Sequence, residues 1–511
     1  MDKSLFIKEV IEENSKIVLI PRPRRFGKSL NFSMLKYFFD MKEKSANLFK
    51  SLEISNEKEC LEHMNKYPVV LISMKDAAVP NWNLSKKGLK VTMSEIYRDY
   101  REELMDVLDE SEKKYYGCIM NEEATDEDLV FSLSKLTKYL ERKHDKKVIV
   151  LIDEYDAVMT EMYGEKEFIE CINFFKLFYG NALKGNNAIH KALMTGIIRI
   201  SGGLEPNNVK VYGVTHNKYG EYFGFTEEEL KPIIKNSELN YEEVKSYYKG
   251  YNFGGTLVYN PWSVVNYLKR GKYGPYWKNT SGNDLIKELV KKGGPEVKYN
   301  FERMLERESV NLEVEDNVNL RELTEGDIYS LLLQSGYLTY EEKDGVRKYK
   351  LPNKEIRDFI SSLVQEITNK IEDKGLEEYV LLKDWLEFEN SLEASIARGI
   401  SFYDISSKEE IRESFYHALL LGIFVNFKNY RIKSNRESGM GRPDLILTRN
   451  EGEESIVIEI KSGPRDGDAT KELERAKRQI KLKSYGEELE GEVIKIGIGF
   501  SGKKMKLEVV D

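Results

Sequence analysis

The chain of 511 residues has few of the features that stabilise secreted or membrane proteins. Its three cysteines, Cys60, Cys118 and Cys171, are scattered and never form a C-x-x-C pair, which excludes a disulfide framework and a thiolate zinc site. The N-terminus has no apolar signal segment, and no apolar run approaches the roughly 18 residues that a bilayer span needs. We therefore expect a cytoplasmic protein that does not enter a membrane.

An excess of positive charge is also missing. The formal net charge is -8, so any contact with nucleic acid must come from a local basic patch. The 12 prolines and 36 glycines are ordinary numbers and argue against long disordered stretches. With 41% hydrophobic residues and about 100–200 residues per domain, a chain of this length predicts several packed domains.

The first motif is Gly27-Lys28-Ser29, which follows a short apolar strand at residues 17–20 and precedes a helical pattern. Strand, loop and helix in this order are typical of a P-loop, in which Lys28 would bind the β- and γ-phosphates of ATP and Ser29 would bind Mg²⁺. Arg22 replaces the glycine that usually stands five residues before Gly27. The tripeptide alone therefore fits a basic surface turn equally well. The apolar face expected for the helix consists of Leu30, Met34, Leu35, Phe38 and Phe39.

Two more apolar strands are predicted at residues 148–152 and 192–194, and the first of them ends at Asp153-Glu154. Ligands of α/β sheets bind beyond the carboxyl ends of the strands. Asp153 would hold magnesium through water, and Glu154 would orient or deprotonate the attacking water. The alternative for such a pair is an ordinary helix N-cap. Strands that alternate with helical stretches predict a doubly wound parallel sheet.

The rest of the chain divides into a mainly helical region, residues 226–395, and a last domain, residues 396–511. A helix at 328–333, followed by strands at 337–340 and 347–351, has the outline of a winged helix. The last domain is predicted to fold in the order αβββαβ.

A second polar motif lies in this last domain. Gly441-Arg442-Pro443-Asp444 leads into one strand, and Glu459 and Lys461 lie two residues apart, hence on one face, of the next. Two carboxylates suit an oxygen-ligated Mg²⁺ or Mn²⁺, and the lysine can orient a water or stabilise charge on a phosphate. An isolated E-x-K strand is otherwise a solvated face.

The strings RPRRFGKSLNFSMLKYFFD, VIVLIDEYDAV and LMTGIIRIS resemble the AAA-ATPase-like family, in which Arg-Phe-Gly-Lys-Ser/Thr replaces the glycine-rich loop. The resemblance implies that residues 1–225 bind nucleotide, and it makes Thr195 and Arg199 candidates for sensing the γ-phosphate. An exposed helix arginine is the alternative for Arg199. Family members usually carry extra residues ahead of the element that matches Asp2-Lys3-Ser4, so part of the pocket wall is expected to differ here. The nucleotide-binding residues implied are Arg25, Phe26, Gly27, Lys28, Ser29, Asp153 and Arg199.

The αβββαβ order, with the strings ESFYHALLLGIF, NYRIKSNRESGMGRPDLIL and IVIEIKSG, resembles the PD-(D/E)XK nuclease superfamily and its restriction-endonuclease-like fold. The resemblance implies that Asp444, Glu459 and Lys461 are catalytic. It further implies that Glu413 helps to hold the metal and that Gln479 lies near the site.

The helix predicted at residues 469–485 carries many cations, among them Lys477, Arg478 and Lys481, which we expect to contact nucleic acid together with Gln479. The alternative is a solvated helix face. His417 is expected to be a packed, hydrogen-bonded histidine rather than a ligand.

Together these features predict an ATP-binding, and by expectation ATP-hydrolysing, protein whose nucleotide controls an Mg²⁺- or Mn²⁺-dependent nuclease. DNA is favoured over RNA as the substrate, and a homo-oligomer stays an open alternative. The rival hypothesis is a switch that does not cleave and binds nucleic acid or a protein partner through its nuclease-like domain.

Overall fold

The structure is a computed structural model. It describes residues 1–201, 208–235, 240–277, 289, 295–305, 309–368, 375–399, 409–424, 427–434, 443–450, 454–464, 466–483, 485–486, 489 and 491–510. The chain forms two compact units, Met1–Thr280 with Asn311–Ile356 and Ser281–Val310 with Arg357–Asp511. Among the described helices, none is both long and apolar enough to cross a bilayer.

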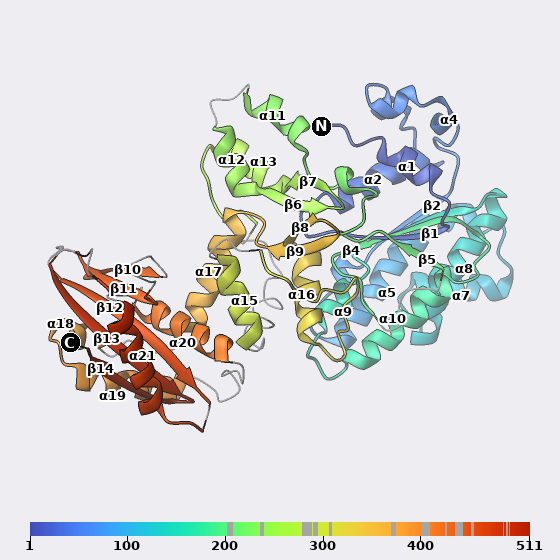
Figure 1. The fold of residues 1–511 in the computed structure, drawn as a ribbon. Helices are drawn as coiled ribbons and strands as arrows, with labels where there is room; N and C mark the ends of the chain where they lie inside the picture. Colours follow the sequence, from blue (N-terminus) through green and yellow to red (C-terminus); the bar gives the residue numbers. More distant parts are fainter. Residues whose placement is uncertain are drawn as a thin grey trace. The chain divides into compact units, whose positions relative to one another are not determined.

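The first unit is built around a parallel sheet of five strands in the order β2-β3-β4-β1-β5 (Figure 1). The strands β1 and β3 are buried at every residue, as expected for a parallel sheet covered on both faces. The predicted strands are the three central ones, and the predicted α/β parallel sheet is confirmed. The edge strands β2 and β5 were not predicted. The strands are β1 (Ile17–Pro21), β2 (Val69–Ser73), β3 (Val148–Asp153), β4 (Ile189–Gly196) and β5 (Val209–Val211).

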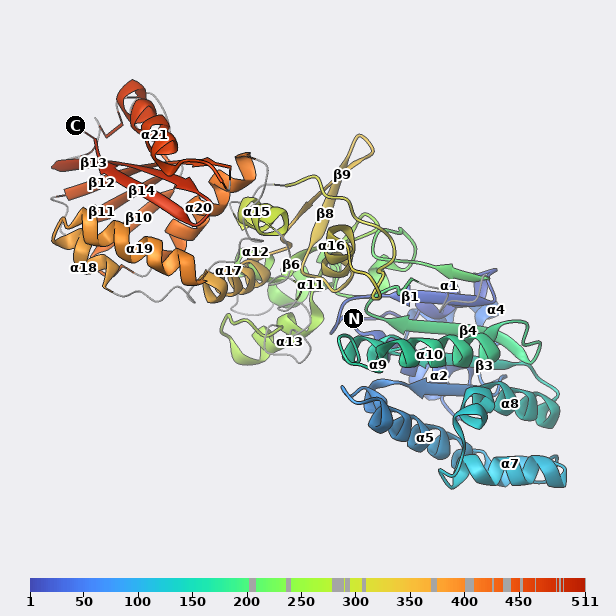
Figure 2. The same cartoon turned by 90° about the horizontal axis from the view of Figure 1, so that it is seen from below.

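Helices join these strands, and α5, α7 and α8 gather beside β2 and β3 (Figure 2). The helices described in the first unit are α1 (Phe6–Glu12), α2 (Lys28–Phe39), α3 (Ala46–Phe49), α4 (Lys58–Leu61), α5 (Trp82–Asp99), α6 (Arg101–Leu104), α7 (Glu110–Met120), α8 (Asp126–His144), α9 (Ala157–Glu161), α10 (Phe168–Leu183), α11 (Glu227–Lys235), α12 (Tyr241–Tyr248), α13 (Pro261–Arg270) and α16 (Glu325–Gln334).

One residue of α2 was placed on the wrong side. Leu30 was expected on the apolar face, but it is 75% exposed. The buried face of α2 follows Lys28, Phe32 and Leu35, which recur at helical spacing. Leu30 lies two residues after Lys28 and therefore on the opposite side of the helix.

The helix and hairpin predicted in the middle region are both present. The helix α16 is followed by the antiparallel pair β8 (Thr339–Lys343) and β9 (Val346–Lys350). The first strand begins two residues later than predicted, because the N–H groups of Tyr337 and Leu338 both bond to the carbonyl of Leu332 and so close the helix. A second hairpin, β6 (Lys249–Phe253) and β7 (Thr256–Tyr259), was not predicted.

The second unit contains a mixed sheet in the order β10-β11-β12-β13-β14. Only the β12–β13 pair is parallel. The predicted αβββαβ order is confirmed and is extended by β14. The elements are α15 (Pro295–Leu305), α17 (Lys354–Thr368, which begins in the first unit), α18 (Leu376–Leu381), α19 (Trp385–Gly399), α20 (Glu409–Phe424), β10 (Tyr430–Ser434), β11 (Leu445–Arg449), β12 (Glu454–Gly463), α21 (Ala469–Lys483), β13 (Glu492–Ser501) and β14 (Lys504–Val509).

The two faces of β12 enter different apolar clusters. Ile456, Ile458 and Ile460 belong to a large core that includes residues of α18, α19 and α20. Val457 instead packs with Ile480 of α21. The expected alternation along this strand is therefore present, and α21 covers the face that carries Glu459 and Lys461.

The helix α21 approaches β13 closely at Gly499. A Cβ atom at this position would lie 2.2 Å from the backbone nitrogen of Leu473 and 2.3 Å from the carbonyl oxygen of Ala469. Only a glycine lets the helix backbone pack this near to the strand. The height of α21 above the sheet thus depends on one missing methyl group.

We predict that Gly499→Ala destabilises the second unit by about 1–3 kcal/mol, the usual cost of overpacking. Gly117→Ala in α7 is the matched control, because a Cβ there meets nothing within 4 Å and the helix gains propensity. Scanning calorimetry of both variants checks the prediction. Equal melting temperatures for the two variants would contradict it.

Candidate nucleotide and nuclease sites

The Gly27-Lys28-Ser29 motif lies where β1 ends and α2 begins. Gly27 adopts a left-handed conformation, with φ of 83°, and no side chain caps the first turn of α2. The first N–H groups of a helix have no partner within the helix, and they favour an anion. Ser29 is exposed at this end of the helix. The backbone geometry therefore suits a phosphate.

Lys28 is buried beside the loop, with 6% of its surface exposed. Its Nζ donates to the carbonyl oxygens of Arg22 at 3.1 Å and Pro23 at 3.0 Å. Burial lowers the pKa of Lys28, and the charges of Asp156 and then Glu154 oppose this shift. The ammonium group therefore sits between the loop backbone and an acidic cluster.

Arg22, which replaces the usual glycine, is fully buried. Its guanidinium donates to the carbonyl oxygens of Pro21 at 2.8 Å and Tyr212 at 2.7 Å. It also lies over the rings of Phe223 and Phe253, at 5.2 and 5.3 Å from their centroids. Burial lowers the pKa of Arg22 to about 9. Arg22 thus anchors the loop from inside rather than adding to a basic surface.

The rest of the loop is held by aromatic residues of the same unit. Phe26 is fully buried against Tyr251 and Phe253, so a nucleotide can reach only its backbone. Arg25 is exposed and lies 4.4 Å from the ring centroid of Trp262. The indole N–H of Trp277 donates to the carbonyl of Arg24 at 3.2 Å.

On the other side of Lys28, the strand β3 ends at Asp153, whose buried Oδ1 has no hydrogen-bond partner among the described residues. Glu154 follows in a left-handed conformation, with φ of 53°. Burial raises the pKa of Glu154. Two carboxylates therefore face the loop from the end of β3, as predicted for the acidic pair.

Asp156 is a residue that the sequence analysis missed. It is 1% exposed, and its Oδ2 accepts the N–H groups of Ile197 and Ile198, both at 2.8 Å. Burial raises the pKa of Asp156. A second acid in the otherwise apolar stretch Tyr155-Asp156-Ala157 was the available signal. Asp156 ties the segment after β4 to the acidic end of β3.

The two predicted γ-phosphate sensors lie at the end of β4 and in the segment after it. Thr195 is fully buried, and its hydroxyl donates to the carbonyl of Ile20 at 2.9 Å. The backbone N–H of Arg199 donates to Gln334 at 2.7 Å, and its carbonyl accepts from Val318 at 2.8 Å. Thr195 thus joins β4 to β1, while contact of Arg199 with phosphate stays a prediction.

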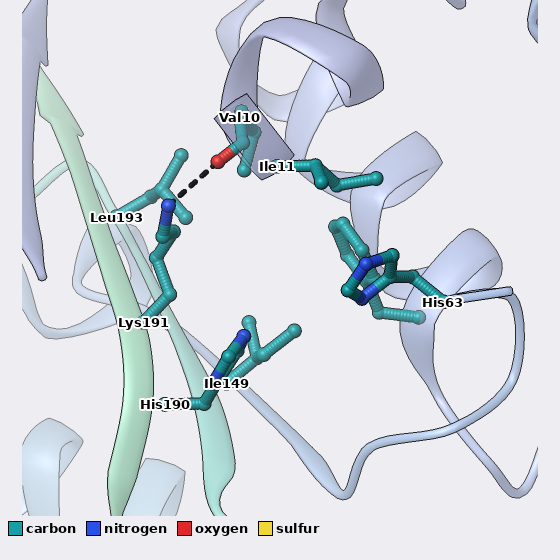
Figure 3. Close-up of a pocket in the computed structure, with 8 residues that line it drawn as sticks. Val10, Ile11, His63, Ile149, His190, Lys191 and Leu193 are labelled. Atoms are coloured by element: carbon teal, nitrogen blue, oxygen red, sulfur yellow. Dashed lines mark hydrogen bonds between the residues drawn. The ribbon is translucent and has the colours of Figure 1, made fainter. Parts of the chain in front are cut away.

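A hollow at the opposite end of this sheet is not part of the nucleotide site (Figure 3). It is lined by His63, His190 and Lys191 among apolar side chains. Lys191 already donates to the carbonyl of Val10 at 2.7 Å. His190 stacks on Tyr67, with ring centroids 4.7 Å apart. The polar groups of this hollow are thus engaged within the protein.

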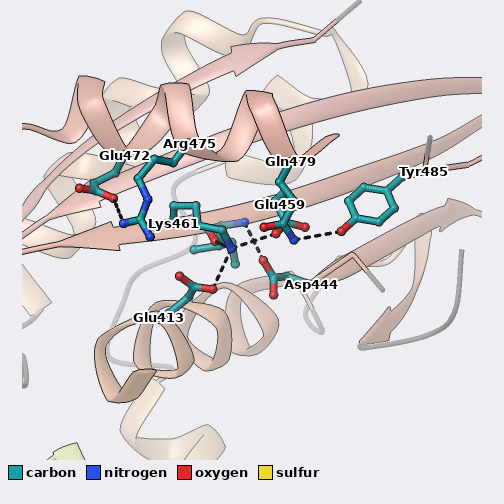
Figure 4. A network of polar contacts seen from close by, with 9 residues as sticks. Glu413, Asp444, Glu459, Lys461, Glu472, Arg475, Gln479 and Tyr485 are labelled. Atoms are coloured by element: carbon teal, nitrogen blue, oxygen red, sulfur yellow. Dashed lines mark hydrogen bonds and ion pairs between the residues drawn. The ribbon is translucent and has the colours of Figure 1, made fainter. Parts of the chain in front are cut away.

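In the second unit, the predicted nuclease residues come together (Figure 4). Lys461 donates to Glu413 of α20 at 2.8 Å and to Glu459 at 2.9 Å. Asp444 lies directly before β11, and its Oδ2 accepts the N–H of Ile460 at 2.7 Å. Gly441 and Arg442 of the same motif lie outside the described residues.

Burial dominates the electrostatics of this centre. Glu459 is 1% exposed, and its Oε2 has no hydrogen-bond partner among the described residues. Burial, and then the nearby Asp444 charge, raise the pKa of Glu459 to about 8. Burial also raises the pKa of Asp444 and of Glu413. For Lys461 burial opposes the charged form, but the carboxylates of Glu459 and Glu413 outweigh it and raise the pKa.

The donor set fits a divalent cation that keeps part of its water shell. The described residues contain no group of three or more His, Cys, Asp or Glu that could hold a metal. Mg²⁺, however, is often bound by one or two carboxylates and several waters. Asp444 and Glu459 supply two carboxylates, and the buried Oε2 of Glu459 lacks a partner within the described chain.

The outer residues of the site divide into two groups. Gln479 donates to the hydroxyl of Tyr485 at 3.1 Å on the side of α21 that faces the centre. His417 hydrogen-bonds with the carbonyl of Asp444, at 3.0 Å. Lys477 instead forms ion pairs with Glu474 and Glu508. Arg478 and Lys481, the other two predicted contacts, are exposed on α21.

The raised pKa of Glu459 predicts a pH dependence of stability in a metal chelator. Between its ordinary value of 4.5 and about 8, the folded chain holds a proton that the unfolded chain has lost. The stabilising contribution is complete below pH 4.5 and disappears as the pH rises through 8. We therefore expect Glu459→Gln to gain stability relative to wild type between pH 5 and 9. Melting curves in EDTA that keep a constant separation across this range would contradict it.

Comparisons with known proteins agree with the two sites. Residues 1–203 match the family described as "Predicted AAA-ATPase", and residues 411–509 match the PD-(D/E)XK nuclease superfamily. An "Uncharacterized protein in vnfD 5'region" of Azotobacter chroococcum mcd 1 is 23% identical over 373 residues, which cover 70% of this chain. The chain spans 64% of the length of that relative.

A solved structure of the ORC2 protein of Aeropyrum pernix, in ADPNP-ADP complexes, is 11% identical, with a TM-score of 0.24. The match covers 71% of this chain and 92% of that one. Both resemblances seen in the sequence are confirmed by the family matches. The chain belongs to the AAA-ATPase-like family through residues 1–203 and to the PD-(D/E)XK nuclease superfamily through residues 411–509.

Proposed function

We propose that this protein is a metal-dependent nuclease controlled by ATP, with DNA favoured over RNA as its substrate. The observation that carries the proposal is the meeting of Asp444, Glu459 and Lys461 at one buried place, with one carboxylate oxygen of Glu459 unpartnered among the described residues. A buried carboxylate without a partner is costly unless a ligand completes it.

In this proposal Asp444 and Glu459 hold Mg²⁺ or Mn²⁺, and Glu413 helps through its contact with Lys461. The metal supplies an acidified water and charge stabilisation at the phosphate. Lys461 is held by two carboxylates, so its Nζ has a defined position from which it donates to the water or to a phosphate oxygen. The hydrogen bond from Ile460 to Asp444 fixes the second carboxylate beside it.

We predict that Lys461→Ala lowers Mn²⁺-dependent cleavage of plasmid DNA by about 10²–10³-fold, the usual loss when one stabilising donor is removed. Lys433→Ala on β10 is the control, because Lys433 is exposed and makes no contact with the centre. Equal cleavage by both variants would refute the assignment. If the wild type binds DNA but does not cut DNA or RNA, the non-cleaving switch is the better description.

The nucleotide half of the proposal rests on the loop and the acidic cluster around Lys28. Lys28 and the free N–H groups of α2 bind the phosphates of ATP. Ser29 and Asp153 hold Mg²⁺, and Glu154 orients the water for hydrolysis. Arg25 and Arg199 supply positive charge near the γ-phosphate.

A route for the control is suggested by Trp277. Its side chain donates to the backbone of Arg24 in the loop, and its own N–H donates to buried Glu355 at 2.7 Å. Trp277 and Glu355 lie just before Thr280 and Ile356, after which the chain passes into the second unit. A change in the loop on nucleotide binding is thereby connected to two of the covalent links between the units.

We predict that Trp277→Phe keeps ATP affinity within about threefold, since it removes a single neutral hydrogen bond. It should, however, reduce the difference between cleavage rates with and without ATP. Trp82→Phe is the matched control, because its indole also donates a hydrogen bond, to Glu170 at 2.7 Å, in another part of the unit. Lys28→Ala should abolish ATP binding. An unchanged response to ATP in Trp277→Phe would exclude this route.

A further inference from the structure

One side of α21 faces the nuclease centre. Glu472, Arg475 and Gln479 recur at helical spacing and lie together above Glu459 and Lys461 (Figure 4). Of these three side chains, only Arg475 is a cation. The centre therefore has one arginine beside it, on an element that is separate from the strands bearing the catalytic residues.

Glu472 fixes the position of this arginine. It is 4% exposed, and a Cβ atom at Gly463 would lie 2.6 Å from its Oε1, so the carboxylate is pressed against the end of β12. Gly463 shares a strand face with Lys461, and residues two apart on a strand are about 7 Å apart. The Oε2 of Glu472 accepts from the guanidinium of Arg475 at 2.6 Å.

Arg475 also acts on the centre through its charge. Burial raises the pKa of Glu413, and the charges of Lys461 and Arg475 both oppose that rise. The side chain of Arg475 is 43% exposed, so it is open to a ligand from solvent. Lys477, by contrast, is 19% exposed and is neutralised by Glu474 and Glu508.

Resting on the proposed nuclease function, we infer that Arg475 binds the backbone phosphate next to the scissile one and that Glu472 is its positioning residue. A guanidinium has five N–H donors in a planar fork, so it can bind a phosphate while one side is held by a carboxylate. The distance of about 7 Å along β12 places this contact beside, and not on, the phosphate at Glu459 and Lys461. Arg475, rather than Lys477, then sets the register of the strand to be cut.

The test uses the full chain, a short DNA duplex and Mn²⁺. Arg475→Ala should raise KM about tenfold or more while kcat changes much less, and Arg475→Lys should recover only part of the loss because the fork is missing. Glu472→Gln should raise KM although the arginine is retained. Arg431→Ala, an exposed arginine on β10, is the matched control and should leave KM unchanged.

The salt dependence of binding separates a phosphate contact from a structural role. Loss of one contact lowers the slope of log affinity against log salt by about 0.9. Arg475→Ala should show this change and Arg431→Ala should not. An unchanged slope with an unchanged KM in Arg475→Ala would overturn the inference, even if the wild type cleaves. If the wild type binds without cleaving, the nuclease proposal fails, while the slope still tests the contact. A wild type that does not bind DNA overturns both.

Discussion

A lysine and a carboxylate that are buried together depend on each other, because either charge left alone out of water costs several kcal/mol. Lys461 and Glu459 are such a pair, and Glu413 completes it from a different element. The strand must therefore carry both residues on one face, and α20 must lie where Glu413 can reach them. The burial of this centre thus constrains the sheet, the helix below it and the helix α21 above it.

The nucleotide site solves the same physical problem in another way. Lys28 has backbone carbonyls as hydrogen-bond partners, and the acids Glu154 and Asp156 act on it only through their charge. A phosphate can therefore take over the ammonium group without breaking an ion pair. At the nuclease centre Lys461 is already paired twice, so a ligand there has to join the existing contacts. This difference suits a site that exchanges ligands and a site that holds a fixed catalytic group.

The features that could be predicted from the sequence are those that depend on local pattern. Apolar runs located β1, β3 and β4, and strand alternation placed Glu459 and Lys461 on one face of β12. Leu30 was misplaced because the neighbours of a helix, and not its composition, decide which side is buried.

The roles of single polar residues depended on contacts far along the chain. Arg22 binds the carbonyl of Tyr212, and Asp156 binds the N–H groups of Ile197 and Ile198. No local pattern reports such partners. The same holds for Arg475, whose position follows from the glycine at 463 against which Glu472 packs.

The most direct test of the account is anomalous diffraction from crystals grown with Mn²⁺ and a non-hydrolysable ATP analogue. The account predicts one manganese peak within coordination distance of both Asp444 and Glu459, at roughly 2.0–2.6 Å from their oxygens. It predicts a second peak between Ser29 and Asp153, beside the phosphates. A peak at the nucleotide with none at Glu459 would contradict the assignment of a metal-dependent nuclease.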